Sequence, residues 1–182
     1  NKYFNIWTIL FAVYISGVVR SIWIFIRNFG YIFKLRTNGT SVPENNGLNI
    51  IKSNQQISAF SFFKNIFVNE KYYNLNESEQ KQILEHEKIH IYQKHSYDIV
   101  FIEFVSIFFW FNPLMKKIKN GIKENHEFIV DNILTQSNKV YDYSMLILKI
   151  KEESSLKFAN SFAETQVVSR IKLMANPEKE KI

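Results

Sequence analysis

The chain contains no cysteine, which excludes a disulfide framework and fits a reducing compartment. Glycine and proline are scarce, at five and three residues, and they form neither a glycine-rich phosphate loop nor an internal repeat. The net charge of +6 comes without a zinc finger, a recognition helix or a basic stripe with regularly spaced aromatic residues. No nucleic-acid partner is therefore expected, whereas the positive charge suits a protein held against anionic membrane lipid.

Histidine is also scarce, with four in 182 residues, yet two of them form the most informative motif of the chain. His86 and His90 are four residues apart, so on an α-helix they share one face and both imidazoles can bind one metal ion. Glu87, about 100° round the helix, can reach a water on that metal without being a ligand. The pattern is the His-Glu-x-x-His signature of zinc metalloproteases.

The sequence around the motif predicts the helix that this geometry needs. Asn76 is suited to an N-cap, Glu79 follows at the third helical position, and the stretch from Gln80 to Lys94 lacks glycine and proline. The motif therefore lies in mid-helix. The competing interpretation is a pair of surface histidines on a charged helix, and an accidental match is expected in about one chain in a few hundred at this composition.

A catalytic zinc ion needs a third protein ligand and leaves one position for water. The downstream candidates are His95, Glu103, His126 and Glu127. His95 is turned away from the metal-facing side if the helix continues. Glu103 would lie about 20 Å along the axis from His90 on a straight helix, so it could bind only across a sharp break. Glu127 has neither problem and is the favoured ligand.

A second helix is expected to carry Glu127. Asn112 and Pro113 suit an N-cap and a first helical position, and a helix from there to about Leu134 could pack antiparallel against the first. Asp131 lies one turn beyond Glu127, where it could accept a hydrogen bond from the outer nitrogen of a liganding histidine. The alternative is an acidic helix face exposed to water.

These residues resemble a known pattern. His86-Glu87-x-x-His90 with Glu127-x-x-x-Asp131 is similar to the gluzincin pattern, and the interval between the two parts resembles the BlaR/MecR-type membrane metallopeptidases, antirepressors that signal β-lactam exposure. The resemblance extends over most of residues 1 to 175. It includes Phe60-Ser61-Phe62-Phe63, Ile66-Phe67, His95-Ser96-Tyr97-Asp98, Trp110-Phe111-Asn112-Pro113, His126-Glu127 and Arg170-Ile171-Lys172-Leu173-Met174.

The resemblance implies a role for each motif residue. His86, His90 and Glu127 would bind zinc, Glu87 would act as general base and then as general acid, and Asp131 would orient His86. Peptide hydrolysis is the implied reaction, with a protein substrate such as a transcriptional repressor or the protein itself. Zinc is inferred from ligand type, since a site of mixed nitrogen and oxygen ligands also suits other divalent ions.

A hydrophobic run from Tyr3 to Ile26 would extend about 36 Å as a helix, enough to span a bilayer. Arg20 is the only charge inside it and is near enough to its end to snorkel to the interface. A signal peptide and a buried helix of a soluble domain are the alternatives, but the run is long and no cleavage site follows it. The chain begins at Asn1 instead of methionine, which suggests a fragment.

Positive residues follow this run, at Arg27, Lys34 and Arg36, so the positive-inside bias places the rest of the chain in the cytoplasm. The resemblance implies that the membrane is the inner membrane of a bacterium. A second apolar run, from Ile99 to Leu114, is broken by Glu103 and is too short to cross. We interpret it as a helix that is either buried against the active-site helices or lying at the membrane surface. Glu103 in this run suits either a buried pair or a solvated face.

The expected fold class is α+β, predominantly helical: a gluzincin-like metallopeptidase domain with an N-terminal transmembrane helix. Its expected parts are a transmembrane helix at 1–27, a juxtamembrane linker at 28–47, a metallopeptidase domain at 48–175 and a flexible tail at 176–182. Short strands are predicted at 48–51 and within 57–68, where a sheet edge could accept an extended substrate or merely cover the core. An amphipathic helix is predicted at 141–151.

The expected function is that of a membrane-anchored zinc metalloendopeptidase acting on a signalling or regulatory protein. Two alternatives stay open: a non-catalytic signalling module with a structural metal, and a membrane quality-control protease of another gluzincin family. The candidates for stabilising an oxyanion are Tyr141, Tyr143 and His126, and the sequence does not select among them.

Overall fold

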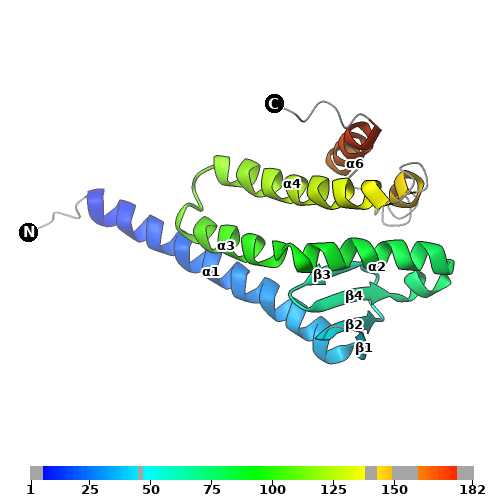
Figure 1. The fold of residues 1–182 in the computed structure, drawn as a ribbon. Coiled ribbons are helices and arrows are strands. Elements are labelled where there is room, and N and C mark those ends of the chain that lie inside the picture. The colour runs from blue at the N-terminus through cyan, green and yellow to red at the C-terminus, as the bar shows by residue number, and fades with distance from the viewer. Residues whose placement is uncertain (1–5, 45–46, 138–142, 149–159, 176–182) are drawn as a thin grey trace, which may run out of the picture.

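The computed structural model describes residues 6–44, 47–137, 143–148 and 160–175. A long N-terminal helix, α1 (Ile6–Asn38), leads into a small sheet, and the remaining helices pack above that sheet (Figure 1). The expected α+β, predominantly helical class is confirmed.

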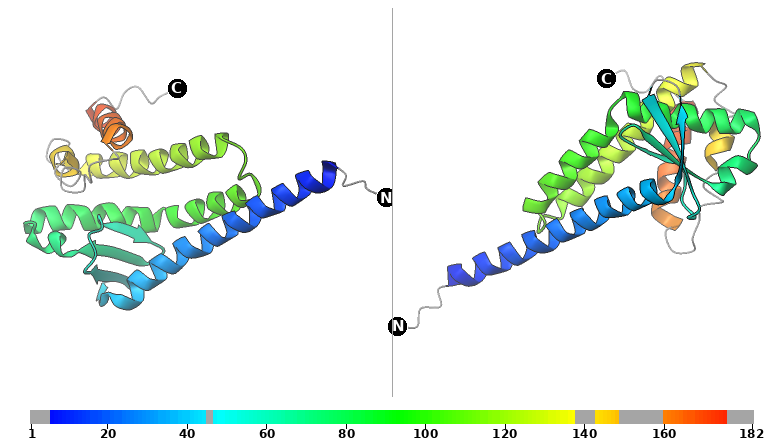
Figure 2. Two further views of the ribbon diagram at one scale, coloured as in Figure 1. Left: turned by 180° about the vertical axis from the view of Figure 1, so that it is seen from behind. Right: turned by 90° about the horizontal axis from the view of Figure 1, so that it is seen from below.

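Helix α1 contains an apolar segment long enough to cross a membrane, and only 6% of its most apolar 18-residue window is buried within the protein. At 33 residues the helix extends about 50 Å, well beyond the roughly 30 Å of a hydrocarbon core. Its N-terminal end projects away from the other elements in all three views (Figures 1 and 2). Its other end belongs to the folded domain, because Leu35 is 2% exposed against the sheet.

The sheet has four strands in the order β1-β2-β4-β3. They are β1 (Thr40–Glu44), β2 (Leu48–Ser53), β3 (Phe60–Phe62) and β4 (Asn65–Asn69). Strands β2 and β4 are parallel, while β1 and β3 pair antiparallel with β2 and β4 respectively. Strand β3 therefore lies at one edge of the sheet.

The two faces of the sheet pack against different helices. Successive side chains of β4 point to opposite faces, so its apolar residues contact both helices in turn. Phe67 points to the side of α1, where it packs with Leu35 and Ile51. Ile66 and Val68 point to the other side, where Ile83 of helix α2 (Glu77–Tyr92) covers them. The sheet thus lies between α1 and the helix that carries the His-Glu-x-x-His motif.

The start of α2 is fixed by a capping box. The Asn76 side chain accepts a hydrogen bond from the Glu79 backbone N–H at 2.8 Å, and the Glu79 carboxylate accepts one from the Asn76 N–H at 3.2 Å. The helix ends before Lys94, which adopts a left-handed conformation with φ of 59°. The chain then turns into α3 (His95–Phe108), so the two helices are not continuous.

Helix α4 (Leu114–Ser137) follows a short connection and runs back antiparallel along α3 and α2 (Figure 1). Asn112 caps it, since its side chain accepts a hydrogen bond from the Leu114 N–H at 2.9 Å. Residues 143–148 are also helical, and α6 (Asn160–Ala175) completes the described helices. A core of Val130, Leu134, Tyr143, Ile147 and Met174 joins these last three elements.

One sequence expectation does not hold. The stretch 28–47 was expected to be a linker, but α1 continues to Asn38 and β1 pairs with β2 from Thr40 to Glu44. Strand β1 is an exposed edge with no apolar alternation, which explains why its composition predicts a loop. The helix predicted at 141–151 is observed at 143–148. Its remaining residues and the 176–182 tail lie outside the described residues.

The contact between α1 and the α3–α4 connection depends on a glycine. A Cβ atom at Gly17 would lie 2.0 Å from Cε2 of Trp110, whereas a Cβ at Gly30 in the same helix would meet nothing within 4 Å. We expect Gly17→Ala to lower the free energy of unfolding by about 1–3 kcal/mol through overpacking, measured by thermal unfolding in detergent. Gly30→Ala should be neutral or stabilising by up to about 1 kcal/mol. Equal unfolding temperatures for both variants would contradict this contact.

Candidate metal centre

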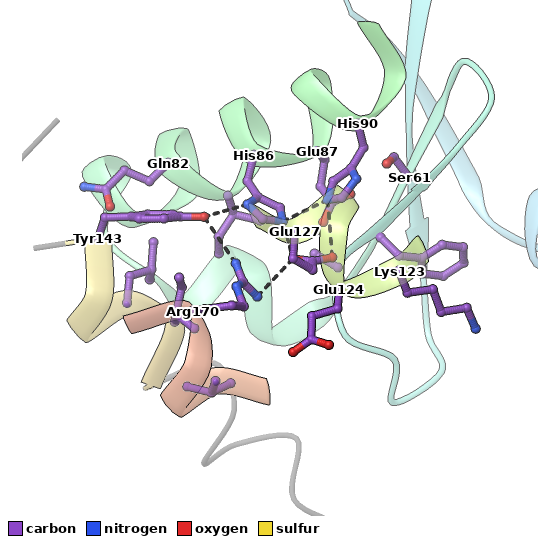
Figure 3. A pocket seen from close by; sticks show the side chains of 16 residues that line it. Ser61, Gln82, His86, Glu87, His90, Lys123, Glu124, Glu127, Tyr143 and Arg170 are labelled. Atoms are coloured by element: carbon purple, nitrogen blue, oxygen red, sulfur yellow. Dashed lines mark hydrogen bonds and ion pairs between the residues drawn. The ribbon is translucent and has the colours of Figure 1, made fainter. Parts of the chain in front are cut away.

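Two histidines of α2 face one point. His86 and His90 lie one turn apart on the same side of the helix, and their Nε2 atoms are 3.1 Å from each other. The capping box and the absence of glycine and proline keep this part of α2 regular, so residues four apart in the sequence lie one helical turn apart on the same face. Both side chains point into a pocket (Figure 3).

Helix α4 brings Glu127 to the same point. Its Oε2 atom is 3.4 Å from His86 Nε2, and its Oε1 atom is 3.5 Å from His90 Nε2. The ligand atoms of all three residues lie within 4.8 Å of one another. Ligands about 2.0–2.1 Å from a tetrahedral zinc ion lie roughly 3.3 Å apart, so these donor atoms fit such an ion.

The other candidate ligands have different partners. Glu103 of α3 pairs with Lys119, with 3.2 Å between Oε2 and Nζ. His95 is the first residue of α3, just after the break at Lys94, and its Nδ1 atom lies 2.8 Å from Nδ1 of His90. His126 stacks on His95 with ring centroids 3.8 Å apart. Neither histidine belongs to the group formed by His86, His90 and Glu127.

His86 is oriented by a buried cluster behind it. The hydroxyl of Tyr143 donates a hydrogen bond to Asp131 Oδ1 at 2.8 Å, and its oxygen lies 2.7 Å from His86 Nδ1. When His86 donates from Nδ1 to this oxygen, Nε2 is the nitrogen left to bind a cation. The direct bond from Asp131 to His86 expected from the sequence is thus replaced by a connection through Tyr143.

Arg170 of α6 ties this cluster to Glu127. Its Nε and Nη2 atoms donate to the two carboxylate oxygens of Asp131 at 2.8 and 2.7 Å, and its Nη1 atom is 2.9 Å from Glu127 Oε2. A bidentate pair of this kind fixes both position and orientation. Figure 3 shows Arg170 reaching between Tyr143 and Glu127. One guanidinium therefore holds Glu127 and Asp131 of α4 together.

The electrostatics of His90 and Glu127 favour the protonation states that a metal site needs, a neutral imidazole and an ionised carboxylate. Burial lowers the pKa of His90 to about 3, and the neighbouring His86 adds to this effect. Burial opposes ionisation of Glu127, but its hydrogen bond with His86 and the charges of His86 and Arg170 lower its pKa to about 2. Burial also lowers the pKa of His86, but the bond with Glu127 and the charges of Glu87 and Glu127 outweigh it and raise the pKa. A bound cation would compete with that proton.

Glu87 occupies a different environment from Glu127. It is 6% exposed, and burial raises the pKa of its carboxyl group. The charge of His86 and hydrogen bonds from Ser61 of β3 offset part of this rise. A carboxyl group with a raised pKa is suited to accept and return a proton near neutral pH.

These residues line a pocket of about 520 Å³. Its walls come from the residues around β3, from α2 and α4, from the 143–148 helix and from α6 (Figure 3). The volume falls in the range typical of ligand sites in proteins. The lining combines the polar groups above with apolar side chains, which are Ala59, Phe60, Ile83, Leu146, Ile147 and Val167.

Sequence analysis missed the parts played by Tyr143 and Arg170. Tyr143 was considered for an oxyanion, yet its hydroxyl contacts His86 and Asp131. Of the other oxyanion candidates, His126 contacts Asp98 behind the site at 3.0 Å, and Tyr141 lies outside the described residues. One signal could have revealed Arg170: it lies on the same face of its helix as the apolar residues Val167, Ile171 and Met174. An arginine on a buried face needs an acidic partner.

Two imidazoles and a carboxylate around one point, with a second buried carboxylate beside them, define a metallopeptidase-type site on an α+β fold. A family model described as BlaR1 peptidase M56 matches residues 2–174, and the chain belongs to this peptidase family. The resemblance found in the sequence is thereby confirmed. No curated protein matches the chain.

Replacing the third ligand should remove the metal. We expect Glu127→Ala to lose most of the bound metal, because two histidines alone leave the ion with too few protein ligands. The metal content of the purified protein is measured by inductively coupled plasma mass spectrometry. Glu124→Ala is the matched control, because Glu124 lies on the same helix but outside the ligand group. Unchanged metal in Glu127→Ala would exclude Glu127 as the ligand.

Removing the hydroxyl behind His86 should weaken metal binding without removing a ligand. We expect Tyr143→Phe to reduce metal affinity about 10- to 100-fold, because His86 Nδ1 loses its partner. The affinity can be measured by competition with a chelating dye. Tyr73→Phe, at an exposed site, should bind metal as the wild type does. Identical affinities for the two variants would show that Tyr143 does not orient His86.

Proposed function

We propose that this protein is a membrane-anchored zinc metalloendopeptidase that hydrolyses a peptide bond in a signalling or regulatory protein. The observation that carries this proposal is the convergence of His86, His90 and Glu127 from two helices, with the carboxyl group of Glu87 buried beside them. Membership of the BlaR1-type peptidase family supports it. Zinc is favoured because the donor set is two nitrogens and a carboxylate at tetrahedral spacing.

The residues divide the chemistry between them. A zinc ion at this site would lower the pKa of a water molecule towards about 7 and polarise a peptide carbonyl. Glu87 accepts the proton of the attacking water and passes it to the nitrogen of the leaving amine. Arg170 and Tyr143 hold Glu127 and His86 in place, which keeps the ligands fixed during the reaction.

The substrate is expected to bind as an extended strand. Strand β3 ends the sheet, and Phe60 and Ser61 of this strand line the pocket beside His86, Glu87 and His90. A peptide added to this edge would form backbone hydrogen bonds with β3 and place one carbonyl over the ligand group. The apolar lining of the pocket then suits an apolar side chain of the substrate.

We place the catalytic domain in the cytoplasm, at the inner membrane of a bacterium. Arg27, Lys34 and Arg36 lie towards the domain end of α1, and the positive-inside bias favours the cytoplasmic side for them. We propose a repressor or the protein itself as the substrate, as the resemblance to BlaR/MecR-type peptidases implies, and membership of the BlaR1 peptidase family supports this choice. A quality-control protease would instead cleave many misfolded membrane proteins, so identifying the cleaved proteins in cells separates the two roles.

Glu87→Gln tests catalysis directly. We expect cleavage of an unstructured protein or peptide mixture to fall by at least about 10²- to 10⁴-fold, because the amide cannot accept a proton. Bound metal should stay near the wild-type level, since Glu87 is not one of the three ligands. Product formation by mass spectrometry and metal content are measured on the same samples.

Glu85→Gln is the matched control for this variant. Glu85 lies on the same helix, is partly exposed and pairs only loosely with Lys81 at 4.0 Å, so activity should be retained. Metal binding by the wild type without metal-dependent cleavage would overturn the proposal. That outcome would favour a signalling module with a structural metal.

A further inference from the structure

A second pocket, of about 440 Å³, lies away from the catalytic one, between α1, α3 and the start of α4. Three basic side chains line it, Arg20, Lys116 and Lys119, together with one acidic side chain, Glu103. Lys119 is paired with Glu103 at 3.2 Å. Within the described part of the chain, Arg20 and Lys116 have no acidic partner, so the pocket carries an excess of positive charge.

The pocket borders a continuous apolar surface. The α3–α4 connection lies against the middle of α1, where Trp110 packs on Gly17 and Tyr14 donates a hydrogen bond to the Phe108 carbonyl at 3.3 Å. The surrounding apolar side chains of α3, the connection and α4 are exposed. They are Phe101, Phe104, Phe108, Phe109, Trp110, Phe111, Leu114 and Ile118. Helix α1, which α3 contacts, also exposes many large apolar side chains, and apolar exposure on both elements suits contact with a membrane.

We propose that this pocket binds the phosphate of an anionic phospholipid, whose acyl chains lie along the exposed aromatic residues of α3 and α1. Arg20 and Lys116 supply two uncompensated positive charges to the lining of the pocket. Phe25 and Trp110 supply apolar wall beside them. The N-terminal end of α4 also lies at the pocket and adds a favourable dipole for an anion.

A lipid explains this combination better than a free anion does. Inorganic phosphate would use the positive charges but would leave the apolar wall without a partner. A zwitterionic lipid would use the apolar wall but would bring its own positive charge close to Arg20 and Lys116. Only a lipid with net negative charge suits both the basic side chains and the apolar wall of the pocket. Arg20 is near enough to the end of the apolar run of α1 for its side chain to reach the membrane interface, where such a headgroup lies.

The test uses the full chain in nanodiscs made from equimolar phosphatidylglycerol and phosphatidylcholine. The bound lipid is counted by native mass spectrometry after release of the protein. We expect the wild type to retain one phosphatidylglycerol molecule in preference to phosphatidylcholine by about tenfold or more. Equal retention of the two lipids would overturn the proposal, and this measurement needs no variant.

A matched pair of double variants separates the pocket from general surface charge. R20Q/K116Q removes the two uncompensated charges, whereas R27Q/K117Q removes the same charges from neighbouring positions that do not line the pocket. We expect the preference to fall about tenfold or more in the first variant and to change less than about twofold in the second. Equal losses in both would show a diffuse electrostatic attraction and contradict the site.

Two further measurements complete the test. Metal content and thermal unfolding of R20Q/K116Q should match the wild type, because the pocket is separate from the metal centre. Excess inorganic phosphate should leave the phosphatidylglycerol bound. Complete displacement by phosphate would identify a free anion as the ligand and overturn the lipid assignment.

Discussion

The architecture of the site depends on one guanidinium group. Arg170 contacts Asp131 and Glu127 at once, so a single cation offsets two carboxylates that stand one turn apart on α4. Asp131 is only 2% exposed, and a buried carboxylate without such a partner would cost several kcal/mol. The pairing also has a directional effect. It turns Glu127 towards the histidines of α2 and turns Asp131 towards Tyr143, whose hydroxyl then reaches His86. Residues from α2, α4, the 143–148 helix and α6 are thereby joined in one network.

The sheet explains why the ligands of α2 are so well placed. Ile66 and Val68 pack against α2, while Phe67 between them packs against the domain end of α1. The position of α2 is therefore fixed relative to α1 through β4, a strand only five residues long. Ser61, on the neighbouring strand, adds a polar link to Glu87. The same small sheet contacts Glu87, the proposed general base, has β3 at its edge beside the pocket, and packs against the end of α1.

Much of the site could be predicted from sequence because its signals are local. The capping residues Asn76 and Asn112 set the helices, and the spacing of His86 and His90 sets their common face. The break after α2 could not be predicted, because a lysine in the left-handed conformation leaves no mark on the sequence pattern. Strand β1 was missed because an exposed edge strand needs no apolar alternation. The role of Arg170 depends on contacts with residues 39 and more positions earlier in the chain, which no local pattern contains.

Helix α4 connects the two pockets, and this connection bears on substrate choice. Lys116 lies near its start and Glu127 lies 11 residues further on, a rise of about 16 Å along the axis. A lipid phosphate held by Arg20 and Lys116 would fix the start of α4 at the level of the lipid headgroups. Glu127 in the catalytic pocket would then lie at most about 16 Å from the headgroups along the axis of α4. Peptide segments close to the membrane surface would then be reached most easily. Since Glu127 faces the two histidines of α2, the geometry of the metal centre depends on the packing of α4 against α2, and no residue of α2 lines the second pocket. One helix thus carries both the lysine of the proposed lipid pocket and the carboxylate of the candidate metal centre, about three turns apart.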